Sequence, residues 1–171
     1  MARLDKLIGN ARTNDQLFDK AKSLVLDLIS AQQISKVREL VEHSLRQDFG
    51  STCCRLWLLS EQSTNSAEQL ISGEDANRQL GRLVNGNKPF CGLLKAEECE
   101  LLFVEQSSKV GSAAVLPLYS DRGLLAILAI ANEDKNYYRD NMSTFLLTYI
   151  GEIVTRVIQQ LSENITTGTA D

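Results

Sequence analysis

The sequence predicts an α+β domain with a mostly antiparallel sheet of five or six strands. The first and last helices are expected together on one face, and short helices on the other. The first supporting observation is a pair of apolar runs, residues 112–118 and 124–131, joined by a polar link that ends at Gly123. This pattern predicts a β-hairpin. Neither run alternates cleanly between apolar and polar residues, so helices should cover both faces of the sheet. The other two observations are an apolar strand before the hairpin and an amphipathic helix at each end.

The N-terminal helix is predicted from a seven-residue repeat between residues 4 and 29. Such a repeat is typical of a helix with a coiled-coil-like seam. Asn14 lies in this seam, where a polar residue favours a defined register and a small oligomer. The two seam positions are occupied by Leu4, Ala11, Phe18 and Val25, and by Leu7, Asn14, Ala21 and Leu28.

The C-terminal helix is predicted over residues 141–161, where apolar residues recur at helical spacing from Phe145 to Leu161. We therefore divide the chain into an N-terminal amphipathic dimerisation helix (1–30), a domain (31–163) and a flexible tail (164–171). A seam that begins before the domain can cover it predicts a two-fold homodimer. The N-terminal helices would meet there and the last helix would complete a bundle.

The remaining elements lie between the first helix and the hairpin. A helix over 35–47 has Ser35 as its expected cap and ends before Gly50. The run 52–59 predicts a strand that is apolar on both faces. The smaller elements predicted after it are a strand around 67–71 and helices over 76–84 and 96–103.

Arg55 is the exception in the apolar strand 52–59. A charge buried there without a partner would cost several kcal/mol, so the guanidinium must find a carboxylate, a carbonyl or a ligand. We favour a salt bridge or a side chain that reaches solvent over a ligand contact.

The composition limits the classes of function. Eighteen basic and 22 acidic residues give a formal charge of −4, without any block of five like charges. A surface for nucleic acid or anionic membrane is therefore not expected. The apolar runs are far shorter than the roughly 20 residues that span a bilayer, and Met1 is not followed by a signal-peptide pattern. We expect a soluble cytoplasmic protein.

The cysteines Cys53, Cys54, Cys91 and Cys99 are expected to be free thiols, because the chain builds an ordinary apolar core without a secretion signal. They lack the C-x2-C spacing of a zinc site, and His43 is the only histidine. We therefore predict neither a metal site nor a cofactor. His43 itself reads as an ordinary residue on or near the helix surface.

Several segments resemble GAF domains. The hairpin VGSAAVLPLYSDRGLLAILAIAN and the helix FLLTYIGEIVTRVI resemble the closing hairpin and last helix of that superfamily. Together with NARTNDQLFDKAKSLVLDLI and KPFCG, they are similar to a proteobacterial GAF-like family of unknown function, whose members are often encoded beside a tyrosine recombinase. The resemblance covers nearly the whole chain and implies the GAF fold.

The resemblance also implies a class of function. GAF domains bind small ligands such as cyclic nucleotides, tetrapyrroles, haem or amino acids, and many serve only to dimerise. Cys91 and Cys99 lack the adjacent histidine of bilin-attaching domains. The cyclic-nucleotide pattern is only echoed, by Asn132 to Lys135. These two ligand classes are therefore not favoured.

Three functions remain open. The first is a non-enzymatic regulatory domain that senses a small molecule in a pocket on one sheet face and dimerises through its terminal helices. The second is a ligand-free dimeric interaction module whose pocket is filled by its own side chains. The third is a reductase of the GAF-fold methionine sulfoxide reductase type, with Cys91 and Cys99 as the candidate pair.

For the first function we expect a pocket between the hairpin and the middle third of the chain, with Arg55 directed at an anionic or carbonyl group. Arg55 and Trp57 share one strand face, and the other candidates lie in segments that match the family best. An ordinary core role is the favoured reading for Trp57 and Phe90. The candidate lining residues are Arg55, Trp57, Phe90, Cys91, Gly92 and Ser112.

Overall fold

The computed structural model confirms the α+β prediction. It describes the backbone of residues 2–86, 88–139 and 144–169, and the side chains of residues 15–86, 88–139 and 144–163. The five-stranded sheet has the order β2-β1-β5-β4-β3, in which only β1 and β2 are parallel. The strands are β1 (Cys53–Ser60), β2 (Leu70–Ser72), β3 (Phe90–Gly92), β4 (Ser112–Ser120) and β5 (Gly123–Asn132).

The predicted hairpin forms the centre of the sheet. β4 and β5 pair from Ser112 opposite Asn132 to Ser120 opposite Gly123, with an irregularity between Leu118 and Tyr119. Gly123 has a φ of +113°, which glycine adopts without steric cost. Both faces of the hairpin are buried, as its lack of alternation predicted.

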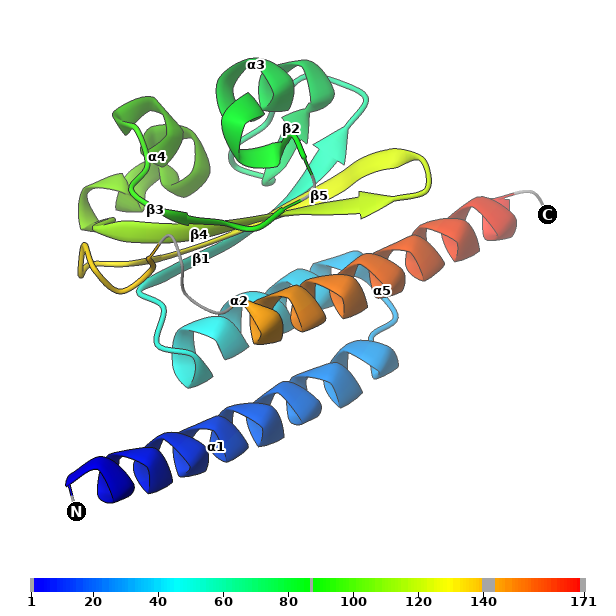
Figure 1. Ribbon diagram of the computed structural model, residues 1–171. Helices are drawn as coiled ribbons and strands as arrows, with labels where there is room; N and C mark the ends of the chain where they lie inside the picture. The colour runs from blue at the N-terminus through cyan, green and yellow to red at the C-terminus, as the bar shows by residue number, and fades with distance from the viewer. Residues whose placement is uncertain (1, 87, 140–143, 170–171) are drawn as a thin grey trace.

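Helices cover both faces of the sheet (Figure 1). α3 (Gly73–Val84) and α4 (Ala96–Phe103) lie on one face, and a 3-10 helix, η1 (Val104–Lys109), follows α4. α2 (Ile34–Asp48) and α5 (Phe145–Thr169) lie on the other face. α1 (Ala2–Ser30) packs against the outer side of α2 and α5. The first helix is therefore on the predicted side, but as an outer layer, and it is α2 that covers the sheet beside α5.

Each face has its own core. The residues on the α2/α5 face include Leu28, Val41, Leu56, Leu128, Ile150 and Val154. Those on the α3/α4 face include Trp57, Leu80, Leu83, Phe103, Val115 and Ile127. Alternate residues of β1, β4 and β5 supply the two cores, which explains why these strands read as continuously apolar.

Two predicted helix starts are wrong in detail. α2 begins at Ile34, and its cap residue is Gln33, whose backbone is extended (φ −136°, ψ 145°), so Ser35 is already helical and cannot be the cap. α3 begins at Gly73, earlier than predicted, because the Ser72 hydroxyl accepts a hydrogen bond from the backbone N–H of Asp75 (3.1 Å).

The two terminal helices differ in part from the prediction. α5 runs to Thr169, beyond the predicted end at residue 161, and its side chains from 164 onward lie outside the described residues. The side chains of the seam from Leu4 to Asn14 also lie outside them. Within the described part, Ala21 and Leu28 are buried inside the chain, whereas Phe18 is half-exposed. None of the described helices is long and apolar enough to span a membrane.

Candidate functional site

The six predicted lining residues do not lie together. β1, with Arg55 and Trp57, is separated from β3 by β5 and β4. Trp57 and Phe90 pack in the α3/α4 core, whereas Cys91 packs in the core on the opposite face. Three surface cavities formed by described residues are all lined by other side chains.

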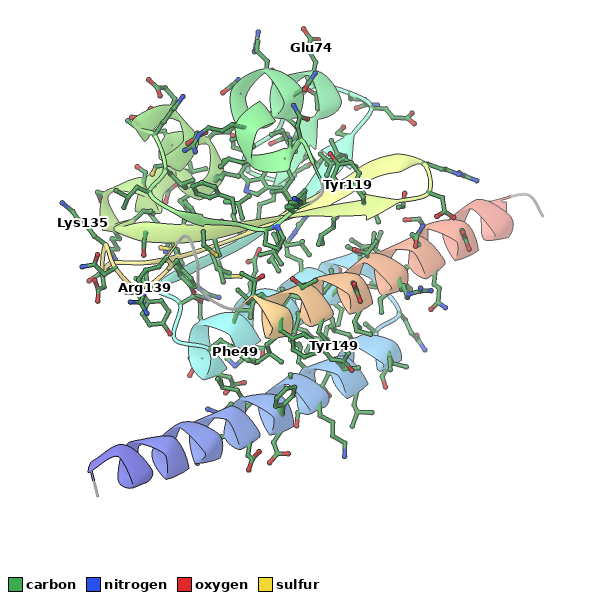
Figure 2. All side chains as sticks on the ribbon, viewed as in Figure 1. Phe49, Glu74, Tyr119, Lys135, Arg139 and Tyr149 are labelled. Carbon is green, nitrogen blue, oxygen red and sulfur yellow. The ribbon has the colours of Figure 1, made fainter. Side chains whose placement is uncertain are left out.

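Trp57 has the core role that the sequence favoured. Its side chain is fully buried, and its Nε1–H donates a hydrogen bond to the carbonyl of Leu102 (3.0 Å). Leu80 and Phe103 are buried in the same core. Side chains fill the layer between the sheet and the helices α3 and α4 (Figure 2).

Arg55 finds a neutral partner rather than a salt bridge. Its Nη1 lies 3.5 Å from Oε1 of Gln69, and the side chain is only partly buried. Gln69 belongs to a small network at the edge of β1. Its Nε2 donates to the carbonyl of Leu56 (2.9 Å) and to Oε2 of Glu42 (2.7 Å). The same Oε2 accepts the N–H of Leu56 (3.0 Å).

This network closes an open strand edge. β2 pairs with β1 only at residues 58–60, so the backbone of Leu56, which pairs with β5 on its other side, has no strand on the side of β2. Glu42 and Gln69 take the place of that strand with side-chain atoms. An unpaired edge is a template for wrong pairing, and its buried groups would be costly if left unsatisfied. The part of β1 around Arg55 therefore has a structural explanation that needs no ligand.

The segment at Phe90 is held by an arginine. The Arg82 guanidinium lies 4.8 Å above the Phe90 ring and forms two hydrogen bonds with the Glu98 carboxylate (2.6 and 2.8 Å). Glu98 also accepts the backbone N–H of Lys95 (2.8 Å) at the start of α4. Gly92 ends β3 with a φ of +147°. The segment thus ties α3, β3 and α4 together.

Ser112 organises the loop that leads into α5. Its Oγ donates to the carbonyl of Asp134 (2.7 Å) and accepts the N–H of Tyr138 (3.0 Å). Tyr138 is buried, and burial raises the pKa of its hydroxyl well above the usual range. At Gly111 a Cβ would lie only 2.0 Å from the carbonyl oxygen of Glu133, so a side chain cannot be accommodated.

The two candidate thiols of the reductase hypothesis lie on different faces. Cys91 is buried under α2 and α5, whereas Cys99 is half-buried on α4. Burial raises the pKa of the Cys99 thiol, and the carboxylates of Glu98 and Glu100 raise it further. A raised pKa lowers the fraction of the nucleophilic thiolate.

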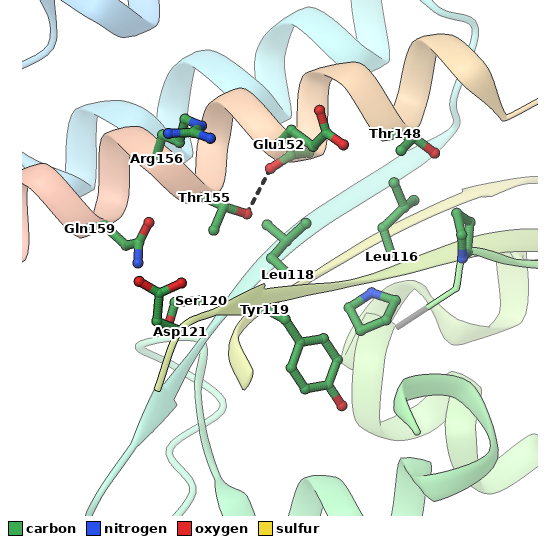
Figure 3. Close-up of a pocket in the computed structure, with 13 residues that line it drawn as sticks. Leu116, Leu118, Tyr119, Ser120, Asp121, Thr148, Glu152, Thr155, Arg156 and Gln159 are labelled. Carbon is green, nitrogen blue, oxygen red and sulfur yellow. Dashed lines mark hydrogen bonds between the residues drawn. The ribbon is translucent and has the colours of Figure 1, made fainter. Parts of the chain in front are cut away.

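A groove lies elsewhere, between the outer half of β4 and α5 (Figure 3). Its volume is about 500 Å³. β3 pairs with β4 only at residues 113–115, so the next part of β4 has a free edge. Leu116 and Leu118 point from β4 toward α5 in Figure 3, while Tyr119 points away. The polar lining residues are Ser120, Asp121, Thr148, Glu152, Thr155, Arg156 and Gln159.

A second surface feature lies where α1 meets α5. The rings of Phe18 and Phe145 contact each other edge to face, with 6.4 Å between their centroids. Phe18 is nevertheless 51% exposed and Phe145 67% exposed. Ile29 on α1 and Tyr149 on α5 are also exposed. We call these four residues the α1–α5 stripe.

The sequence matches the model of one protein family, described as "Protein of unknown function, DUF484", over residues 1–163. The chain belongs to this family. No curated protein matches the sequence. The fold of this DUF484 member is that of GAF domains, as comparison with solved structures shows.

Three of these structures illustrate the similarity. The GAF domain of a phosphoenolpyruvate-protein phosphotransferase from Coxiella burnetii has a TM-score of 0.64 at 11% identity, over 89% of this chain and 98% of that chain. A biliverdin-bound protein in its far-red absorbing dark state has a TM-score of 0.59 at 14% identity, over 84% and 99%. The GAF domain of the potassium sensor histidine kinase KdpD from Escherichia coli has a TM-score of 0.56 at 14% identity, over 86% and 96%.

The sequence reasoning missed the groove of this DUF484 chain, although two residues signal it. Pro117 lacks an N–H and so marks β4 as a strand with a free edge. Gly151 lies inside α5, where a Cβ would come within 3.0 Å of Leu118 Cδ2. A glycine inside a helical pattern often marks such a close approach. Neither signal could show that the two residues face each other.

Proposed function

We propose that this DUF484 chain is a non-enzymatic regulatory domain that self-associates through α1 and α5 and senses a small molecule. The observation that carries the proposal is the α1–α5 stripe. Single exposed apolar residues are common, but a contiguous patch typically marks an interaction site. Phe18 and Phe145 already touch each other, so the exposed apolar surface passes from one helix to the other at this point.

A second copy of the chain is the partner that fits this stripe. α1 and α5 lie side by side, and the N-terminal turns of α1 project beyond the helices on which it packs (Figure 1). Two such pairs, related by a two-fold axis, form a four-helix arrangement in which each stripe covers the other. Because Ala21, Val25 and Leu28 are buried inside the chain, Phe18 is the one seam residue among those with described side chains that is left for the proposed contact.

Analytical ultracentrifugation tests the assembly. We expect the intact chain to sediment as a dimer, and the double variant Phe18→Ser/Phe145→Ser to sediment as a monomer. Leu93→Ser is the matched control, since Leu93 is equally exposed but lies between β3 and α4. A chain without residues 1–15 tests the part of the seam whose side chains are not described. A monomeric intact chain, or a double variant that dimerises as well as the intact chain, would contradict the proposal.

The small-molecule part of the proposal is supported by the β4–α5 groove, because α5 contributes to both the groove and the stripe. A ligand there would touch the helix through which we propose that the chain associates. The filled α3/α4 core favours the second candidate, a ligand-free interaction module. Heat-stability shifts with a metabolite panel distinguish the two, because a ligand that binds the folded state raises the unfolding temperature.

The non-enzymatic part is supported by the placement of Cys91 and Cys99 on opposite faces of the sheet. The family resemblance leads us to propose further that the gene lies beside that of a tyrosine recombinase in a proteobacterium. The identity of the flanking genes tests this.

A further inference from the structure

We propose that the β4–α5 groove binds a small zwitterion, whose ammonium group lies against Asp121 and whose carboxylate lies against Arg156. This inference rests on the small-molecule part of the proposed function and names the site and the chemistry of the ligand. It places the ligand on the helix-covered α2/α5 side, in a groove whose lining includes Pro89 but none of the six residues expected from the sequence.

The shape of the groove suits a small organic molecule. Its volume of about 500 Å³ lies within the range of small-molecule pockets. Leu116 and Leu118 lie beneath α5 at the bottom of the groove and are only 3% and 4% exposed (Figure 3). They leave little apolar surface for a ligand to cover, so a ligand would bind mainly through the polar and charged lining residues.

The charged lining residues are available to a ligand. Asp121, Glu152 and Arg156 have neither a hydrogen bond nor an ion pair from their side chains within the described part of the chain. Glu152 and Arg156 are four residues apart on α5, a spacing that permits an ion pair, yet they do not form one. The groove therefore offers both signs of charge at once.

The balance of charge determines the class of ligand. Two carboxylates and one guanidinium line the groove, so a purely anionic molecule would meet net repulsion. An ammonium group is attracted by the carboxylates, and a carboxylate on the same molecule can use the planar guanidinium of Arg156. A molecule with both groups can pair with Arg156 and with one of the two carboxylates at once, which a molecule with a single charge cannot do.

Neutral polar groups complete the site. Figure 3 shows Gln159 and Asp121 facing each other at one end of the groove. The Thr155 hydroxyl donates its proton to the Gly151 carbonyl (2.8 Å), so its oxygen is left as an acceptor. Thr155 and Asp121 can thus both accept from one ammonium group, while the Gln159 amide can donate to a ligand oxygen.

A series of amino acids with increasing separation between the charges tests the inference. The probes are glycine, β-alanine, γ-aminobutyrate, δ-aminovalerate and ε-aminocaproate, with butylamine and butyrate as single-charge controls. Binding is followed by NMR titration of the intact protein at low ionic strength, because salt screens exposed charges. We expect one member of the series to bind roughly five-fold more tightly than either control, as two exposed ion pairs of modest strength would give.

Three variants locate the site. Asp121→Asn and Arg156→Gln should each weaken the best probe roughly three- to ten-fold, as expected for charge-assisted hydrogen bonds at a partly exposed site. Arg122→Gln is the control for Arg156→Gln, since Arg122 is exposed and does not line the groove. All three side chains are exposed, so the variants should fold, and circular dichroism checks this.

Each outcome gives a decision. Saturable binding that both groove variants weaken supports the inference. Binding that neither variant changes overturns the groove as the site but leaves a small-molecule sensor intact. Equal binding of butylamine overturns the zwitterion, and no binding by any member of the series overturns the inference as a whole. Titration of the monomeric stripe variant separates these results from a failure of self-association.

Discussion

The two faces of the sheet are built from alternate residues of the same strands, yet they differ in what lies outside them. On the α3/α4 face, short helices cover a core that contains Trp57 and Phe103, both fully buried. The outer surfaces of these helices carry charged residues such as Glu74 and Arg78. On the α2/α5 face, the longer helices leave an apolar stripe and a polar groove at the surface.

This difference indicates which face of the sheet has surface available for binding. A face that is filled and enclosed by polar helix surfaces mainly contributes stability. A face whose outer helices expose Phe18, Ile29 and Phe145 has surface left to bind a partner. Measurements that compare the two faces can therefore separate structural residues from functional ones.

The largest expected effect is on the α3/α4 face. Trp57→Ala should lower the free energy of unfolding by about 3–5 kcal/mol, because it opens a cavity and leaves the Leu102 carbonyl without its partner. Urea denaturation measures the loss. Leu93→Ala on the same side is the control, and its exposed side chain should change stability by no more than about 0.5 kcal/mol. Equal losses for the two variants would mean that this face is not the closed core described above.

A smaller effect is expected at the edge of β1. Glu42→Ala should cost about 1–3 kcal/mol, because it leaves the backbone N–H of Leu56 and one of the two N–H bonds of the Gln69 amide without their acceptor. Urea denaturation again measures the change. Glu39→Ala on the same helix is the control, since its exposed contact with Lys36 (3.5 Å) is worth little. A loss at Glu42 no greater than that at Glu39 would refute the closed-edge interpretation.

The smallest effect concerns pH on the α3/α4 face. Hydrogen bonds, chiefly from Thr64, and the charge of Arg78 hold the pKa of Asp75 below its usual value. A carboxyl whose pKa is lower in the folded state stabilises the fold above its unfolded pKa of about 3.9. This contribution is lost as the pH falls through the folded pKa. Stability should therefore decrease between about pH 5 and pH 2.

Thr64→Val should flatten that dependence, because it removes the main donor to Asp75. The free energy of unfolding, measured across this pH range, gives the slope. Thr148→Val on α5 is the control, since its hydroxyl makes no hydrogen bond with Asp75. An unchanged slope in Thr64→Val would show that the acid sensitivity arises elsewhere.

Much of the fold could be predicted from local patterns. The hairpin at residues 112–131 and the helix that follows it are visible as apolar runs and helical periodicity, because burial on two faces or on one stripe leaves a direct trace in composition. β3 was not assigned, since Phe90–Gly92 is only three residues long and has no period to detect. The start of α2 was also misplaced, because Ser35 was expected as the cap residue and the cap is Gln33.

The candidate site was much less accessible to prediction. Arg55 stood out as a charge in an apolar strand, but its partner Gln69 is fourteen residues away along the chain. The two side chains meet because β2 pairs only with residues 58–60 of β1 and leaves room for Gln69 beside the rest of the strand. Asp121 and Gln159 are separated by thirty-eight positions, and only the approach of α5 to β4 at Gly151 brings them to one groove.

By itself the sequence determined the class of fold, the covered central hairpin and the amphipathic character of the outer helices. These features depend on which residues must leave water, and that requirement is local. The tertiary structure alone decided that two strands, β5 and β4, separate β1 from β3, that Cys91 and Cys99 lie on opposite faces, and that the groove lies beside α5. Strand order and helix placement depend on contacts between distant segments, for which no single stretch of sequence carries a signal.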